Sequence, residues 1–72
     1  MKLTPRQHDT LEAIRVYIAK HGFSPSMREI CDALGVASTN SAHEHLSALE
    51  DKGYITRLPG KARTVRIVKG AA

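Results

Sequence analysis

Two histidines flank a glutamate in the segment from Ser38 to His45, whose sequence is STNSAHEH. Such a cluster could hold a metal ion, support catalysis, or form a surface that recognises a ligand. On a helix, residues two positions apart point about 200° away from each other, so His43 and His45 cannot share one metal ion. Zinc sites on a helix need histidines four residues apart, and this spacing does not occur in the chain. We therefore expect no metal site and no cofactor.

Nucleophilic catalysis has no better support in the sequence. The chain contains no G-x-S-x-G elbow and no glycine-rich phosphate-binding loop. A protein of 72 residues is also too small to combine a packed core with a deep substrate pocket. We expect that the protein is not an enzyme.

The composition indicates one small globular domain, because 42% of the residues are apolar and 25% are charged. Cys31 is the single cysteine, which excludes a disulfide framework and favours a reducing compartment. No apolar segment follows Lys2 as in a signal peptide, and no run approaches the roughly 18 apolar residues of a membrane span. We expect a cytoplasmic protein without a membrane partner.

Charge is distributed unevenly along the chain, whose formal net charge is +4. Residues 1–51 contain five basic and seven acidic residues, whereas residues 52–72 contain six basic residues and no acidic residue. A basic segment of this kind favours a polyanionic partner such as nucleic acid. It could also be a solubilising tail, but its alternation of apolar and polar residues favours a folded segment that faces phosphate groups.

The first element predicted along the chain is a helix from about Pro5 to His21. Thr4 and Gln7 have the spacing of a capping box, and proline suits the first helical position. Gly22 supplies a left-handed end. Apolar residues recur at spacings of three and four, which gives one buried face: Leu11, Ile14, Tyr17 and Ile18.

Two shorter helices are predicted next. Ser26 and Glu29 repeat the capping-box spacing, so a helix of about eight residues begins at about Met27 and ends before Gly35. A third helix then spans about Asn40 to Lys52, with Thr39 or Asn40 as its cap. Two helices joined by a short turn that contains glycine have the spacing of a helix-turn-helix.

The end of the chain predicts a β-hairpin. Strands are expected over Tyr54–Leu58 and Arg63–Val68, joined by turn residues 59–62. The whole pattern predicts an α+β fold, a three-helix bundle with a C-terminal two-stranded β-hairpin, which is a winged helix-turn-helix. We expect one domain over residues 1–69, with residues 70–72 as a frayed end or the start of a hinge.

The third helix has one face that the core does not use. If Ala42, Leu46 and Leu49 face inward, His45 lies near the core edge. A helix-turn-helix places the N-terminal part of its second helix against base edges in the major groove, so we expect readout there. The alternative is an ordinary solvated first turn that favours caps and an acidic residue. The candidates for base readout are Asn40, Ser41, His43 and Glu44.

Affinity for DNA must come from basic residues elsewhere, because the third helix carries acidic residues and no lysine or arginine before Lys52. The predicted hairpin is the main source of phosphate contacts, with Arg66 among its basic residues. The residues that we expect to contact the DNA backbone are Arg6, Arg28, Thr39, Lys52, Arg57, Lys61 and Arg63.

The order and spacing of several short motifs resemble the N-terminal DNA-binding domain of the LexA repressor family of the bacterial SOS response. The resemblance covers nearly the whole chain and is carried by Leu3-Thr4-x-Arg6-Gln7, Gly22-x-x-Pro25, Glu29-Ile30-x-x-x-Leu34-Gly35, Ser38-x-Asn40-x-Ala42-x-Glu44-His45-Leu46-x-Ala48-Leu49 and Lys52-Gly53. It implies a winged helix-turn-helix that represses transcription from double-stranded operator DNA, and hence a nucleoid-associated protein.

The resemblance adds Ser38 to the base-contacting residues and implies a homodimer on a palindromic operator. Three positions depart from the family's pattern: Thr39 stands where proline is common, Ser41 where alanine is common, and His43 where glutamate is common. These departures leave the preferred half-site open.

Three possibilities remain open from the sequence. LexA proteins continue into a domain that dimerises and cleaves itself with a serine and a lysine, and none of that domain is in this chain. The chain could be the excised DNA-binding domain, with dimerisation supplied by the absent domain, or a natural short repressor without self-cleavage. A winged-helix module that binds another protein is the alternative from a different functional class.

Overall fold

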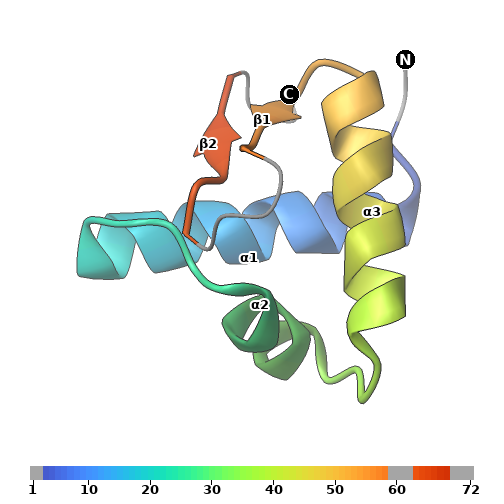
Figure 1. Ribbon diagram of the computed structural model, residues 1–72, viewed down its shortest axis with the longest axis horizontal. Coiled ribbons are helices and arrows are strands. Elements are labelled where there is room, and N and C mark those ends of the chain that lie inside the picture. The colour runs from blue at the N-terminus through green and yellow to red at the C-terminus, as the bar shows by residue number, and fades with distance from the viewer. Residues whose placement is uncertain (1–2, 59–62, 69–72) are drawn as a thin grey trace.

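The computed structural model describes residues 3–58 and 63–68 of the chain. Three helices are followed by a two-stranded antiparallel sheet, as Figure 1 shows. This arrangement confirms the predicted α+β fold of the winged helix-turn-helix type. The elements are α1 (Pro5–His21), α2 (Met27–Leu34), α3 (Thr39–Asp51), β1 (Ile55–Thr56) and β2 (Arg66–Ile67).

Local capping sets the ends of α1 and α2 where the sequence predicts them. The hydroxyl of Thr4 accepts a hydrogen bond from the amide of Gln7, and the Gln7 side chain accepts one from the Thr4 amide. Ser26 and Glu29 form the same reciprocal pair at the start of α2. After α2, Gly35 adopts a left-handed conformation with φ of 70°, which glycine tolerates without steric cost and which ends the helix.

Helix α3 begins one residue earlier than predicted. The cap is Ser38, not Thr39 or Asn40, and its hydroxyl accepts from the amide of Asn40. Several small polar residues occur in a row here, and each could cap a helix. Ser38 is the cap because its backbone is extended, with φ of −108° and ψ of 131°.

The two strands are much shorter than predicted. Only the pairs Ile55–Ile67 and Thr56–Arg66 lie in register, so the predictions of Tyr54–Leu58 and Arg63–Val68 as strands are wrong in extent.

Between the two paired strands and the turn, backbone amides of the hairpin donate to side chains. The amide of Leu58 donates to the hydroxyl of Thr64, and the amide of Val65 donates to the hydroxyl of Ser24. Arg63 has a left-handed backbone with φ of 58°, which a strand cannot accommodate. The hairpin is therefore held to itself and to the rest of the fold partly by side chains.

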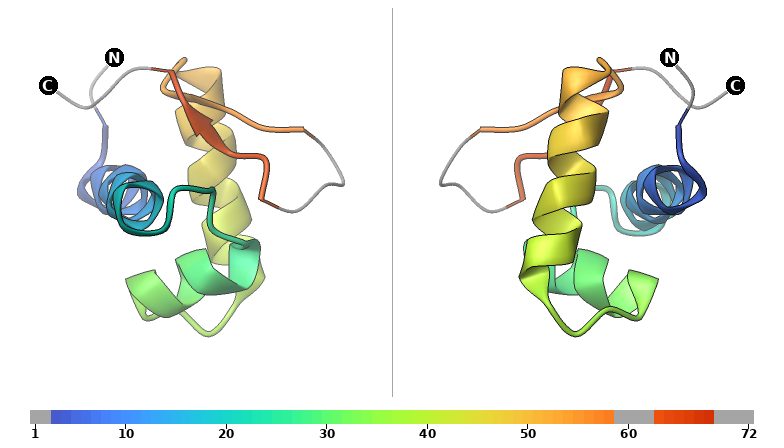
Figure 2. Two further views of the ribbon diagram at one scale, coloured as in Figure 1. Left: turned by 90° about the vertical axis from the view of Figure 1, so that its left-hand side faces the viewer. Right: turned by 90° about the vertical axis from the view of Figure 1, so that its right-hand side faces the viewer.

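A single core lies between the helices and the hairpin. Helix α3 contacts α1, α2 and β1, which makes it the central element. In Figure 2, α1 is seen end-on beside the middle of α3, α2 lies near the N-terminal end of α3, and the strands cross near its C-terminal end. The most deeply buried large side chains include Ile14, Ile30, Leu46, Leu49 and Ile55.

Two predictions concern residues outside the described ranges. The hairpin turn at residues 59–62, with Lys61 as a phosphate contact, lies outside them, as does the proposed end of the domain at residues 69–72. The domain bounds therefore stay a prediction.

Candidate nucleic-acid interface

The outward face of α3 is free of core contacts at its N-terminal half. Ala42, Leu46 and Leu49 are fully buried and define the inward stripe of the helix. At about 100° per residue, Asn40 and Glu44 lie opposite that stripe, and both are exposed. The first turns of α3 therefore present amide and carboxylate groups to a ligand that approaches the helix end.

The start of α3 is fixed by its cap and by α2. Ser38 is exposed, its hydroxyl holds the Asn40 amide at 3.2 Å, and its carbonyl accepts from the thiol of the buried Cys31 at 3.8 Å. Thr39 is exposed at the first helical position, whereas Ser41 is half-buried. These contacts join the two helices of the helix-turn-helix at the turn itself and orient the first residues of α3.

The two histidines of the segment lie in different environments. His43 is exposed on the outer face of α3, and His45 is half-buried at the edge of the core. Within residues 3–58 and 63–68 no three histidine, cysteine or acidic side chains gather in a way that could hold a metal ion. Of the two histidines, His43 is the one on the outer face of α3.

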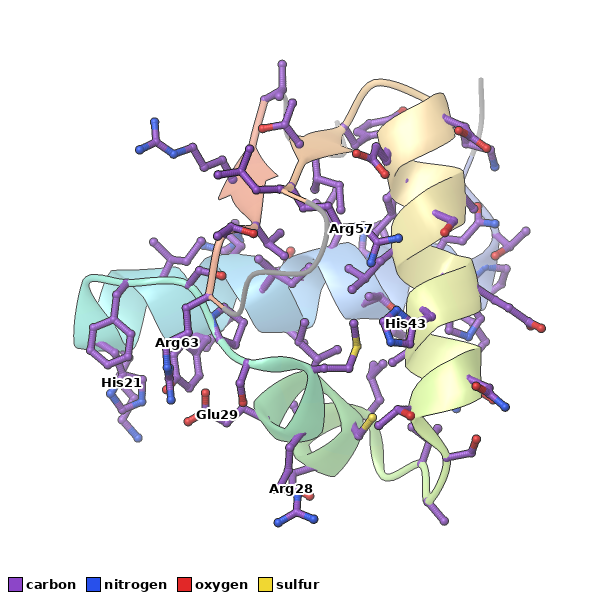
Figure 3. The ribbon with its side chains drawn as sticks, viewed as in Figure 1. His21, Arg28, Glu29, His43, Arg57 and Arg63 are labelled. Atoms are coloured by element: carbon purple, nitrogen blue, oxygen red, sulfur yellow. The ribbon has the colours of Figure 1, made fainter. Side chains whose placement is uncertain are left out.

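Arg57 connects the hairpin to the outer face of α3. Its Nη2 donates to the hydroxyl of Ser47 at 3.0 Å, and its Nε lies 3.4 Å from a carboxylate oxygen of Glu50. Ser47 is exposed one turn after His43, and Figure 3 shows Arg57 and His43 beside the same helix. A predicted phosphate contact thus lies next to the predicted base contacts.

Lys52 lies at the opposite end of α3 from the predicted base contacts. Its ammonium donates to Oε1 of Gln7 at 2.6 Å, and Gln7 also closes the capping box of α1. Arg6 is exposed on the first turn of α1, and Arg28 is exposed on the first turn of α2. Figure 3 shows the Arg28 side chain projecting away from the body of the molecule. The predicted backbone contacts are therefore distributed over several elements.

Arg63 lies in a different part of the molecule from His43. Figure 3 shows it beside Glu29 and His21, where α1 ends, across the view from α3. Its Nη1 lies 2.8 Å from Oε1 of Glu29. Hydrogen bonds from the Ser26 backbone, Tyr17 and Arg63 lower the pKa of Glu29 from 4.5 to about 2, the first being the largest cause. The guanidinium is thus paired with a carboxylate that stays ionised at neutral pH.

The structure brings some predicted residues together and separates others. Ser38, Asn40, Ser41, His43 and Glu44 all lie within the cap and first two turns of α3. Ser47 joins them on the outer face but was missed, although its place four residues after His43 is a helical spacing that could have identified it. Tyr17 and Ser24, which contact Arg63, carry no sequence signal for that role.

In the described part of the chain, no helix has the length and apolar character needed to cross a membrane.

Comparison with known proteins gives one consistent result. The sequence profile of the family described as "LexA DNA binding domain" matches residues 1–64. The LexA repressor of Bacillus mycoides (strain KBAB4) is 49% identical over 67 residues, which are 93% of this chain and 33% of the relative. The LexA repressors of Bacillus thuringiensis (strain Al Hakam) and Bacillus anthracis are also 49% identical, over 93% of this chain and 32% of each relative. The chain spans about a third of the length of these relatives.

Proposed function

The chain belongs to the LexA DNA binding domain family, and on this premise we propose that it binds operator DNA and represses transcription. One observation supports this proposal above the others. The N-terminal half of α3 is exposed along the face opposite its buried stripe, and it follows α2 through a turn that contains Gly35. A helix-turn-helix inserts this part of its second helix into the major groove.

The side chains on this face suit base edges. Asn40 can form two hydrogen bonds with adenine, and Glu44 can accept from the amino group of cytosine. An N–H group of His43 can donate to N7 or O6 of guanine. Ser38 and Ser41 have hydroxyl groups that donate or accept, so they fit either type of base. We propose that these five residues determine the preferred half-site.

Basic residues on several elements supply the affinity in our proposal. The backbone contacts that we propose are Arg6, Arg28, Thr39, Lys52, Arg57 and Lys61, whereas Arg63, also predicted as a phosphate contact, is paired with Glu29. Residues 52–72 carry six basic residues and no acidic residue, which offsets the acidic groups of α3 near the DNA.

We further propose that two copies occupy a palindromic operator. One α3 contacts only a few base pairs, so a single copy has limited specificity. Two-fold related helices fit successive major grooves when the half-sites are about one helical turn, roughly 34 Å, or a multiple of it apart. An operator with two inverted half-sites at such a spacing is the expected target.

Selection from a random duplex library tests the proposed function. The protein should enrich one inverted half-site, and its affinity for the enriched duplex should fall steeply as salt rises from about 50 to 200 mM. A scrambled duplex of the same length and base composition is the control. Enrichment of no sequence, or an affinity that salt does not change, would contradict the proposal.

A further inference from the structure

The hairpin is fastened to the α1–α2 region by the side chain of Arg63. Nη1 of Arg63 lies 2.8 Å from Oε1 of Glu29 and 3.2 Å from the carbonyl oxygen of Ser24, and it donates to the hydroxyl of Tyr17 at 3.3 Å. The guanidinium also lies over the ring of Phe23, 5.1 Å from its centroid. We call the set Tyr17, Ser24, Glu29 and Arg63 the wing clamp.

Ser24 makes a second connection in the same place. It is buried, and its hydroxyl accepts a hydrogen bond from the amide of Val65 at 3.2 Å. The hairpin thus meets Ser24 twice, through the Arg63 side chain and through the Val65 backbone, although about forty residues separate them in sequence. Among the described residues the strands form two pairs, extended by a hydrogen bond from the Val68 amide to the Tyr54 carbonyl. Ile55 and Val65 also pack into the core, and the Ser24 contacts add to these in orienting the hairpin.

Glu29 is the acceptor that joins three elements. Its Oε1 accepts from the Ser26 amide at 2.8 Å and its Oε2 from the Tyr17 hydroxyl at 2.7 Å, in addition to the ion pair with Arg63. Ser26 and Glu29 form the capping box of α2, the first helix of the helix-turn-helix. One carboxylate therefore links the start of that helix, the end of α1 and the hairpin.

The backbone of Arg63 supports a structural role as well. Its φ of 58° is the one positive value among the described residues that are not glycine. Such a conformation is unfavourable for a residue with a side chain, and it persists where surrounding contacts enforce it. At this position the guanidinium contacts Glu29, Tyr17 and Ser24, and the next residue but one, Val65, is held by Ser24.

We propose that Arg63 is a positioning residue, which holds the hairpin in its orientation relative to the helix-turn-helix through Glu29, and that it is not primarily a phosphate contact. A phosphate would compete with a carboxylate that already lies 2.8 Å from the guanidinium. The importance of this orientation for DNA binding rests on the proposed function. The fastening of the hairpin itself does not.

The variant Glu29→Gln distinguishes the two roles of Arg63, because they predict opposite changes in the affinity for DNA. Glutamine preserves the capping box of α2 but removes the charge that Arg63 faces. If Arg63 binds phosphate, losing a nearby negative charge should strengthen DNA binding. If Arg63 acts through the wing clamp, the same variant should weaken binding about as much as Arg63→Ala, by roughly fivefold or more.

A second comparison uses Arg63→Lys. Lysine keeps the positive charge and can bind phosphate as a point charge, but it lacks the planar group that reaches several acceptors and covers the Phe23 ring. We expect Arg63→Lys to bind DNA as weakly as Arg63→Ala. We also expect the double variant of Glu29→Gln and Arg63→Ala to bind no more weakly than either single variant, because both remove the same interaction.

Hydrogen exchange of the Val65 amide tests the wing clamp without DNA. We expect Arg63→Ala, Arg63→Lys and Glu29→Gln each to speed this exchange by about tenfold, while amides in the middle of α1 change little. Glu12→Gln is the matched control, because the ion-pair partner of Glu12 is Arg15 on α1, which is not part of the clamp. Far-ultraviolet circular dichroism verifies that each variant is folded.

DNA binding and hydrogen exchange at Val65 test the proposed function and the wing clamp separately. DNA binding that Glu29→Gln strengthens, or that Arg63→Lys preserves, overturns the positioning role. Unchanged exchange at Val65 overturns the fastening itself. If the unaltered protein binds no duplex selectively, the proposed function fails and the DNA-linked role of Arg63 fails with it, while the exchange result still decides whether Arg63 and Glu29 fasten the hairpin.

Discussion

The guanidinium of Arg57 donates to the hydroxyl of Ser47 at 3.0 Å, so the residue that follows β1 reaches the outer face of α3. Its contact with Glu50 is long, at 3.4 Å, compared with 2.8 Å for the pair of Arg63 and Glu29. Arg57 is thus less tightly paired with a carboxylate than Arg63, although its side chain is the less exposed of the two, 21% against 44%, and we propose it as a phosphate contact.

Arg57→Ala should therefore weaken binding to preferred and random duplexes alike. The plot of log affinity against log salt should lose about one unit of slope, because one phosphate contact disappears. Stability should change by no more than about 1 kcal/mol, since the ion pair lies near the surface. Lys20→Ala is the control, because it removes the same charge from the exposed last turn of α1. An equal change of slope in both variants would refute the assignment of Arg57.

Asn40→Ala and Glu44→Ala should affect sequence preference as well as affinity. Each removes the hydrogen bonds that we propose to one base, which should cost about 1–3 kcal/mol on the preferred duplex and little on a random one. The measurement is the ratio of affinities for the two duplexes. A loss of equal size on both would mean that these side chains do not contact bases.

His43 is an exposed residue of α3 and one of the three positions that depart from the pattern of the LexA resemblance. Replacement of His43 by glutamate, which is common there, should change which base is preferred at one position of each half-site. Because the side chain is exposed, stability should change by less than about 0.5 kcal/mol. Library selection with both proteins gives the result, and identical half-sites would show that His43 contributes no readout.

The features that could be predicted from the sequence are the local ones. Capping boxes involve residues three positions apart, and the apolar stripe of α3 repeats every three or four residues, so both are visible in the order of residues. The hairpin was predicted less well, because Val65 donates to Ser24 and the Arg63 backbone is left-handed. No period or motif encodes such contacts.

At the candidate site, the exposed face of α3 could be predicted but the pairing of Arg63 could not. The exposed residues of α3 follow from helical geometry once its buried face is known. The pairing of Arg63 with Glu29 joins residues 34 positions apart in sequence, and it depends on how α2 and the hairpin pack. A count of basic residues cannot distinguish an arginine that faces a carboxylate from one that faces solvent.

Leu46 holds α3, the helix that carries the proposed base contacts, in the core. Its side chain is fully buried, whereas His43 and Ser47 on the same helix are exposed. Leu46→Ala should lower the free energy of unfolding by about 2–5 kcal/mol, because it removes buried apolar contacts and leaves a cavity. Urea denaturation measures the change. His43→Ala is the exposed control on the same helix, and a similar loss in both variants would contradict the assigned core.

Glu29 should make the stability of the protein depend on pH in the acidic range. Its pKa is about 2 in the folded state against an ordinary 4.5, chiefly because the Ser26 amide donates to it and then because Tyr17 and Arg63 do. Below pH 4.5 the unfolded chain binds a proton that the folded protein does not, so protonation favours unfolding. The contribution of Glu29 is therefore complete above about pH 4.5 and is lost as the pH falls toward 2.

Urea denaturation between pH 2 and 7 tests this dependence. The difference in free energy of unfolding between the unaltered protein and Glu29→Gln should be largest above pH 4.5 and should shrink steadily toward pH 2. Tyr17→Phe should reduce the dependence without abolishing it, because the Ser26 amide and Arg63 still favour the carboxylate. A difference that stays constant over the whole range would mean that Glu29 has the same pKa in the folded and unfolded chain, and that its hydrogen bonds do not stabilise the ionised form.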